Sequence, residues 1–586
     1  MLPITLRLSA RNLILALVFA CFAVGASYAH PQQSSQARTE NAQAVPTLHV
    51  TTRLVEVNVI VNDKHGNPIS GLSQKDFSIL DKGKPQEIRV FSAATNLPSA
   101  PSQGSLPLDT YTNRPEELSN IPSSVTVILL DALNTAAADQ TLARRQVIRV
   151  LQEIHPQEYV ALYWLGNRLQ ILHDFTTDSS VLRQVLADFG SKSSRELDNS
   201  ELADPSLNTP NPSAPSGQVS ERQAFRLAFD QRVANQSTRD RVRATVAALI
   251  AIANHLGSRT GRKNLVWVSS SFPVSVGYDK FDLNWANDAG EQFDTEVRRA
   301  ARALTDADIA VYPVDARGLV GSNISANDQD LDQHIGDPSD TDTRLPTRAA
   351  PETFDTMRIL AERTGGRAFY GTNDLAGAIR RALNDSRVTY TLGYYPSDVK
   401  WDGGFHDIKV SVAAAGADVR TRSGYFAVPD VPPVPSKNDH ALIAQLAASQ
   451  LPASGIGLHV RTQTSKDSRG QTLIAEVHLN LREIQMQNKE GRWTGAVQSV
   501  FLQLDNAGHV LQVDDRTFFP EFDSSTYEHA LQSGISDTRR IRVLPSAAQL
   551  CIVVRDAINA NIGSIYLPLA KVFHDSSSVK DGSSHL

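Results

Sequence analysis

The sequence predicts an α/β protein: a mostly parallel sheet with helices on both faces, flanked by an N-terminal β-module and a C-terminal antiparallel β-sandwich. The central part of this prediction rests on residues 122–385, where short apolar runs alternate with helical patterns. Parallel strands joined by helices give that alternation. The flanking parts rest on near-alternate β-branched residues in 48–95 and on apolar runs separated by turn residues after residue 437.

Length, charge and cysteine content restrict the class of protein. The chain has 586 residues, enough for several domains of roughly 100 to 200 residues each. Its 57 Lys and Arg residues nearly balance 63 Asp and Glu residues, so charge gives no reason to expect nucleic acid or an anionic membrane as partner. The only cysteines are Cys21 and Cys551, which excludes a disulfide framework, a cysteine-based zinc site and an iron–sulfur cluster.

Residues 1–29 match a secretory signal peptide. Arg7 and Arg11 precede an apolar run at 13–24, and small residues follow up to Ala29. The run is shorter than the roughly 20 apolar residues that cross a bilayer as a helix, so no stable membrane span is expected after cleavage. We therefore expect an exported protein, periplasmic or extracellular.

The segments before the central domain are a leader and a small β-structure. Residues 30–47 are rich in Gln, Ser and Ala and predict a flexible leader. Near-alternate apolar residues up to Val61, followed by short apolar runs at 77–80 and 88–91, predict a β-module at 48–97.

The central domain is predicted to span 122–427 in the order βαββαβαβαβα, closed by three further strands. Strands are expected at 125–130, 159–165, 169–172, 264–268, 309–314, 367–370, 388–395, 406–412 and 419–426. Helices are expected around 147–154 and at 239–256, 292–306, 353–364 and 374–385. A turn at Gly166 makes 159–172 a hairpin, so one edge strand should be antiparallel. Polar stretches at 191–219 and 318–350 predict loop insertions.

A proline-rich linker at 428–437 precedes the last predicted domain. Apolar runs recur there with turn residues between them, so residues 438–575 are predicted to form an antiparallel β-sandwich. Its strands are expected at 457–461, 473–479, 499–504, 540–544 and 550–554. Residues 576–586 read as a polar tail.

Candidate chemistry lies where the first strand of the parallel sheet ends. Ligands of such open sheets bind beyond the carboxyl ends of the strands, where the strand order reverses. The residues that follow Leu130 include Asp131, Asn134 and Thr135. Carboxylate and hydroxyl oxygens suit a hard divalent cation such as Mg²⁺, which can in turn accept a carboxylate from a partner protein.

Over 125–135, 264–273, 308–319, 360–383 and 390–396, the chain resembles the von Willebrand factor type A (VWFA) domain. It resembles more closely the secreted bacterial VWFA-related proteins of the acidobacterial type. The resemblance covers about 48–427 and implies a Rossmann-like domain. It also implies a metal-ion-dependent site with Asp-x-Ser-x-Ser on a first loop, a Thr on a second and an Asp on a third.

This chain departs from that pattern in two places. Asp131 and Thr135 match its first and fifth positions, but Leu133 has no oxygen to offer at the third. Where the third-loop Asp is expected, the chain has the serine cluster 269–271. Thr238 is the candidate for the second-loop Thr.

The resemblance therefore implies a degenerate site for Mg²⁺ or another divalent cation, with a partner-binding rim around it. The candidate metal ligands are Asp131, Thr135 and Thr238. The candidate partner-binding residues are Asp131, Asn134, Thr135, Ser269 and Ser270.

The function expected from these features is non-enzymatic binding of another protein, in adhesion or scaffolding. No Gly-x-Ser-x-Gly elbow, His-Glu-x-x-His pair, phosphate loop or dinucleotide glycine fingerprint occurs in the chain. Two alternatives stay open. One is a structural envelope component without a ligand. The other is a serine hydrolase that uses Ser269, Ser270 or Ser271, which would require a base within hydrogen-bond reach.

Overall fold

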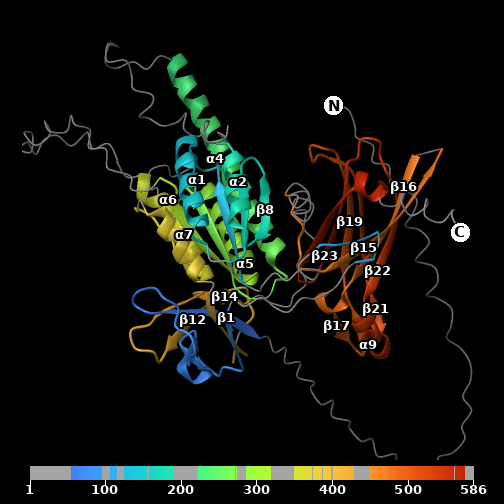
Figure 1. Ribbon diagram of the computed structural model, residues 1–586. Coiled ribbons are helices and arrows are strands. Elements are labelled where there is room, and N and C mark those ends of the chain that lie inside the picture. Colours follow the sequence, from blue (N-terminus) through green and yellow to red (C-terminus); the bar gives the residue numbers. More distant parts are fainter. Residues whose placement is uncertain are drawn as a thin grey trace, which may run out of the picture. The chain divides into compact units, whose positions relative to one another are not determined.

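The structure is a computed structural model (Figure 1), and it describes residues 54–574 with internal gaps. The gaps are 96–105, 108, 115–123, 155–157, 191–220, 260, 271, 273–285, 318–348, 373, 386, 398–399, 428–448, 450, 469 and 560. The predicted signal peptide, leader, proline-rich linker and polar tail, nearly all of both insertions, and Ser271 lie outside the described residues. Among the helices that are described, none combines the length and apolarity needed to cross a membrane.

A five-stranded sheet forms the centre of the doubly wound domain, in the order β10-β9-β6-β7-β8. Its strands are β6 (Val125–Asp131), β7 (Val160–Leu165), β8 (Leu169–Thr176), β9 (Lys263–Ser269) and β10 (Ile309–Asp315). Strands β6, β7, β9 and β10 are parallel, and β8 is an antiparallel edge strand. The mostly parallel sheet and its antiparallel edge are thereby confirmed.

Helices cover both faces of this sheet (Figure 1). They are α1 (Ala137–Leu151), α2 (Ser179–Asp188), α4 (Glu221–Leu256), α5 (Ala286–Asp306), α6 (Ala349–Thr364) and α7 (Leu375–Asn384). Because side chains alternate along a strand, Val127 and Leu129 of β6 pack with α4, α5 and α6, whereas Ile128 and Leu130 pack with α1, α2 and α7. Strand β6 is therefore buried on both faces, which explains the apolar run at 127–130.

Two details of the predicted domain are wrong. Residues 367–370 form no strand: Phe369 makes only an isolated parallel bridge to Val314 of β10. Helix α4 begins at Glu221, well before the expected start at residue 239.

A first β-sandwich is built from chain segments that precede and follow the doubly wound domain in the sequence. Its sheets are β13-β1-β11-β4 and β14-β12-β2-β3, around one apolar core. The strands are β1 (Val55–Asn62), β2 (Phe77–Asp81), β3 (Lys84–Gln86), β4 (Val90–Thr95), β11 (Val388–Tyr394), β12 (Phe405–Val412), β13 (Asp418–Thr421) and β14 (Gly424–Phe426). The three closing strands predicted for the central domain thus complete the N-terminal β-module instead, because β11 pairs with β1 and β4, and β12 pairs with β2.

The C-terminal strands form two antiparallel sheets around a shared apolar core. One sheet has the order β22-β16-β15-β5 and the other β20-β19-β23-β24. Its strands are β15 (Leu458–Asp467), β16 (Gly470–Leu479), β19 (Val497–Leu504), β20 (Val510–Phe518), β22 (Ile535–Arg542), β23 (Gln549–Asp556) and β24 (Ile562–Pro568). A small sheet of β17 (Gln487–Lys489), β18 (Arg492–Thr494) and β21 (Glu521–Asp523) and the helix α9 (Ser524–Ser533) complete it. The remaining strand, β5 (Thr110–Thr112), comes from the segment before the doubly wound domain.

Candidate functional site

The candidate site lies at the carboxyl end of β6, where the order of the strands reverses. The chain continues from β6 to β7 on one side, and β9 lies on the other. At such a switch point two loops diverge, which in open α/β sheets leaves a crevice for a ligand. Asp131 is the last residue of β6 and Ser269 the last residue of β9, so the sheet brings these two predicted site residues together.

The Asp131 carboxylate is buried, with 2% exposure, and accepts four hydrogen bonds. Its Oδ2 accepts from Trp267 Nε1 and Ser269 Oγ, both at 2.9 Å, and from Asn134 Nδ2 at 2.8 Å. Its Oδ1 accepts from the backbone N–H of Asn134 at 3.0 Å. The carboxylate therefore joins its own loop to strand β9.

Asn134 extends this network to helix α4. Its Nδ2 donates to Thr245 Oγ1 at 2.8 Å, and its Oδ1 accepts from Arg241 Nε at 3.1 Å. Both partners are buried. The loop after β6, strand β9 and helix α4 are thus held together by one buried set of hydrogen bonds.

Thr238 does not take the place predicted for it. It lies inside α4 rather than ahead of a helix, seven residues before Thr245. At 1.5 Å of rise per residue this is about 10 Å along the helix axis. The hydroxyl of α4 that reaches the site is Thr245. The sequence did not indicate it, because the second-loop Thr was expected ahead of the predicted helix, whereas Thr245 lies inside it.

Thr135 and Ser270 form the outer part of the site. Thr135 Oγ1 accepts a hydrogen bond from the backbone N–H of Ser270 at 3.1 Å, and Ser270 Oγ donates to Asp139 Oδ2 at 3.0 Å. Asp139 is on the first turn of α1 and is half-buried. These contacts fasten the loop after β9 to the start of α1.

Asp315 ends β10, two strands from β6, as the strand order requires. Arg317 Nε donates to its carboxylate at 3.1 Å. Burial, together with the nearby negative charge of Asp139, raises the pKa of the Asp315 carboxyl, although the hydrogen bonds from Arg317 oppose this. Asp315 is therefore engaged with its own loop and does not reach Asp131.

Burial also raises the pKa of the Asp131 carboxyl above its ordinary value near 3.8. Desolvation penalises the charged form, and the hydrogen bonds from Asn134, Trp267 and Ser269 lower the pKa by less than burial raises it. These hydrogen bonds stabilise the buried carboxylate. They offset only part of the free energy that the carboxylate loses when it leaves water.

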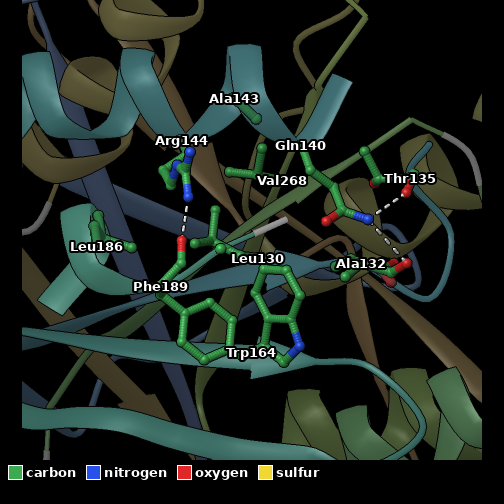
Figure 2. A pocket seen from close by; sticks show the side chains of 12 residues that line it. Leu130, Ala132, Thr135, Gln140, Ala143, Arg144, Trp164, Leu186, Phe189 and Val268 are labelled. Carbon is green, nitrogen blue, oxygen red and sulfur yellow. Dashed lines mark hydrogen bonds between the residues drawn. The ribbon is translucent and has the colours of Figure 1, made fainter. Parts of the chain in front are cut away.

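A small cavity lies beside this network, under helix α1 (Figure 2). Trp164 and Phe189 meet edge to face on one side, with ring centroids 4.7 Å apart. On the other side Gln140 Nε2 donates to the carbonyls of Thr135 and Ala132 at 2.7 Å and 3.4 Å. The cavity measures about 20 Å³, which is space for about one water molecule and none for a small-molecule ligand.

The residues present do not fit a divalent cation. The N–H and O–H groups of Trp267, Ser269 and Asn134 direct hydrogens at the carboxylate oxygens that a cation would need. Leu133 is 1% exposed and offers no oxygen, whereas Mg²⁺ requires octahedral oxygen ligands. Within the described part of the chain, no cluster of three or more His, Cys, Asp and Glu side chains is placed to hold a metal ion.

The thermal unfolding midpoint of the purified chain should be the same in millimolar Mg²⁺ or Mn²⁺ as in the presence of a chelator. A ligand raises the midpoint only by binding the folded state, and Asp131 already carries protein donors. Scanning calorimetry with and without the cation measures this. A rise with the cation that disappears in Thr135→Val would instead locate a cation site here.

The five residues predicted for partner contact are all buried. Asp131, Asn134, Thr135, Ser269 and Ser270 have exposures between 0% and 7%, because their polar groups bond to one another across the ends of β6 and β9. They can position a binding surface, but they do not form one. The accessible part of the rim is the start of α1, where residues 136–138 are exposed and Asp139 is half-buried.

Comparison with known proteins gives only distant likenesses. No protein-family model and no curated protein matches the chain. An aerotolerance-related membrane protein from Bacteroides fragilis is 11% identical over 45% of this chain and 98% of its own, with a TM-score of 0.23. A von Willebrand factor type A structure from Catenulispora acidiphila is 7% identical over 62% of this chain and 79% of its own, with a TM-score of 0.24.

A third solved structure covers more of the chain at the same low similarity. The three N-terminal domains of a type V pili tip protein from Porphyromonas gingivalis are 10% identical over 89% of this chain and 96% of that one, with a TM-score of 0.23. TM-scores this low carry no functional inference. The fold assignment rests on the strand order of the chain itself.

Proposed function

We propose that this chain is an exported, non-enzymatic protein-binding protein of the VWFA type, which contacts another protein through the rim at the start of α1. The observation that carries the proposal is the filled switch point. The place where an open α/β sheet usually admits a ligand is occupied by the side chains of Leu133, Trp267 and Phe272, each buried to 1% exposure or less. A surface then remains for recognition, and surfaces suit macromolecular partners.

The network around Asp131 gives this surface its rigidity. Hydrogen bonds tie the loop after β6 to β9 and α4, and Ser270 ties the loop after β9 to Asp139. A binding surface that is ordered before contact loses less conformational entropy on binding. We therefore assign the buried residues a positioning role and assign contact with the partner to Asp139 and its exposed neighbours.

Recognition at this rim is proposed to be independent of a metal ion. In an A-type site with a bound cation, the cation would accept a carboxylate from the partner. Here Trp267, Ser269 and Asn134 donate hydrogen bonds to Asp131 where a cation would bind. The charged group proposed to face a partner is therefore the carboxylate of Asp139. A basic side chain of the partner would complement it.

Neither alternative gains support from the geometry. A serine nucleophile must meet its substrate, but Ser269 is fully buried and donates to Asp131, and Ser270 donates to Asp139. A structural component without a ligand has no specific observation in its favour. It is separated from the proposed function by the following test.

Asp139→Lys should reduce capture of the partner from an envelope or surface-protein extract by about tenfold or more, because it reverses the charge of the rim. The matched control is Asp407→Lys, the same charge reversal at an exposed position of β12. Recovery is quantified by mass spectrometry against the unmodified chain, with and without a chelator. Proteins recovered equally by all three chains would remove the rim from the proposal.

A further inference from the structure

Strand β5 is a short strand that completes the C-terminal sandwich from far away in the sequence. Thr110, Tyr111 and Thr112 pair with Arg461, Val460 and His459 of β15. Two backbone hydrogen bonds extend the pairing, from Thr462 N to the Asp109 carbonyl at 2.9 Å and from Asn113 N to the Leu458 carbonyl at 3.4 Å. The edge of β15 therefore pairs with a segment of five residues, 109–113, whose three central residues form the strand.

Asn113, directly after β5, is held in a buried polar pocket. It is 2% exposed. Its Nδ2 donates to the carbonyls of Ala453 and Ile456 at 2.6 Å and 2.8 Å, and its Oδ1 accepts from the backbone N–H of Leu458 at 2.8 Å. Because both amide hydrogens and the oxygen are engaged, the pocket suits the carboxamide of asparagine.

Arg114 adds a second specific contact. Its guanidinium forms a two-pronged pair with Glu483, with Nη1 at 2.7 Å from Oε1 and Nη2 at 3.1 Å from Oε2. Its Nε and Nη2 also donate to the Ser454 carbonyl at 3.1 Å and 2.8 Å. Both charged side chains are largely buried, at 14% and 21% exposure, and bidentate pairs of this kind combine strength with geometric selectivity.

Together these contacts form a strand-accepting site that has a sequence preference. An open sheet edge binds any extended chain through its backbone, and side-chain pockets then select the sequence. The preference here is for a short strand followed by Asn-Arg. In the structure, residues 109–114 of this chain occupy the site.

We propose that a second copy of the chain binds this edge of the C-terminal sandwich with its own residues 109–114, so that two chains exchange β5. Asn113 and Leu458 are 345 positions apart, so no hairpin loop holds the donor beside its acceptor. The register itself has three residue pairs, so the contacts that are exchanged are mainly those of Asn113 and Arg114. The same contacts form whichever chain supplies the strand, which makes exchange a low-cost route to a dimer.

Concentration decides which form predominates. A strand on the same chain competes at an effective concentration that is typically millimolar for short links. Exchange is therefore favoured when chains fold at high local concentration. In the exchanged dimer each sandwich contains Asn113 and Arg114 of the other copy, so neither site is complete without its partner.

Two full-length variants with different affinity tags test the proposal. One carries Thr110→Cys and the other carries Arg461→Cys. These positions are directly opposite one another on β5 and β15, where facing residues can be bridged by a disulfide. The native Cys551 is fully buried. Both variants also carry Cys21→Ser, so that the introduced cysteines are the reactive ones. A disulfide between the two variants that exceeds the collision control below then reports β5 of one chain beside β15 of the other.

The variants are refolded together at increasing concentration, oxidised mildly and separated on a non-reducing gel. We expect a heterodimer that carries both tags, increases with concentration, and decreases severalfold when the donor chain also carries Asn113→Ala or Arg114→Ala. The matched control replaces Arg461→Cys with Glu476→Cys. Glu476 is likewise exposed and faces Arg461 from β16, on the side of β15 away from β5.

A chain that carries both Thr110→Cys and Arg461→Cys completes the test. If this chain forms only an intramolecular disulfide at every concentration, and the mixture of the two single variants gives no heterodimer, exchange does not occur. If it forms no disulfide at all, β5 does not occupy this edge. An equally strong heterodimer with Glu476→Cys would show collision of surface cysteines rather than pairing. Each of these three results overturns the proposal.

Discussion

Asp385→Ala should lower the free energy of unfolding by about 3–5 kcal/mol, the typical result of breaking a buried ion pair from one side. Asp385 is 2% exposed and accepts from both Nη atoms of Arg420, from the hydroxyl of Tyr312 at 2.8 Å and from Asn62 Nδ2 at 3.2 Å. The substitution would leave both Nη atoms of Arg420, the hydroxyl of Tyr312 and Asn62 Nδ2 without this buried acceptor. Urea denaturation followed by tryptophan fluorescence measures the change.

Asp418→Ala is the matched control, because Asp418 pairs with the same Arg420. Its side chain is 54% exposed and lies 3.4 Å from Arg420 Nε. Exposed ion pairs contribute at most about 1 kcal/mol, so little change is expected. Equal losses from the two substitutions would mean that burial does not set the strength of this cluster. A large loss from Asp385→Ala alone would show that Asp385 links two parts of the fold. These are the first sandwich, which contains Asn62 and Arg420, and strand β10, which contains Tyr312.

Asp131→Ala should cost about 3 kcal/mol or more, because an unsatisfied buried donor costs about 1–3 kcal/mol. The substitution would leave the indole N–H of Trp267, the backbone N–H of Asn134 and one of the two amide hydrogens of Asn134 Nδ2 without their acceptor. Ser269→Ala is the milder control, with an expected cost of about 1 kcal/mol, since three donors to the carboxylate remain. Similar small losses for both would show that the carboxylate is not the centre of the network.

The pH dependence of Asp131→Asn follows from the raised pKa of the carboxyl. A group that binds a proton more tightly in the folded state adds stability as the pH falls through its raised pKa toward its ordinary value near 3.8. The unmodified chain has this gain, and Asp131→Asn lacks it. The difference in stability between the two chains should therefore grow on acidification from neutral pH toward that value. Denaturation curves at several pH values measure it, and a difference that stays constant or shrinks would contradict the raised pKa.

Strands that are buried on both faces could be predicted from the sequence, and exposed or short strands could not. Strand β6 has an apolar run at 127–130 because helices cover both its faces, and such a run is visible in the sequence. Strand β20 is exposed along almost its whole length, so it has no apolar alternation. Strand β5 has three residues and is stabilised by a distant partner, so its own segment carries no pattern.

The candidate site was only partly predictable for a related reason. The sequence placed Asp131 and Ser269 at the ends of strands, and their meeting follows from strand order alone. Whether the Asp131 carboxylate is exposed or buried depends on Trp267 and Asn134. Trp267 of β9 donates to Asp131 and Asn134 donates to Thr245 of α4, and these long-range contacts are not visible in the sequence. Trp267 carried a weak signal, because it is the one indole among the aliphatic residues at 265–268.

The division of the first sandwich across the sequence sets an order of events during synthesis. Side-chain partners such as Asn58 and Thr391 are 333 positions apart, so β1 cannot acquire β11 until most of the polypeptide has emerged. Until then the apolar residues of β1, including Val57 and Val59, which are fully buried in the finished protein, are open to unwanted pairing. Contacts so far apart in sequence form slowly. A chaperone that shields the first strands until the later ones arrive would therefore favour correct folding of this chain.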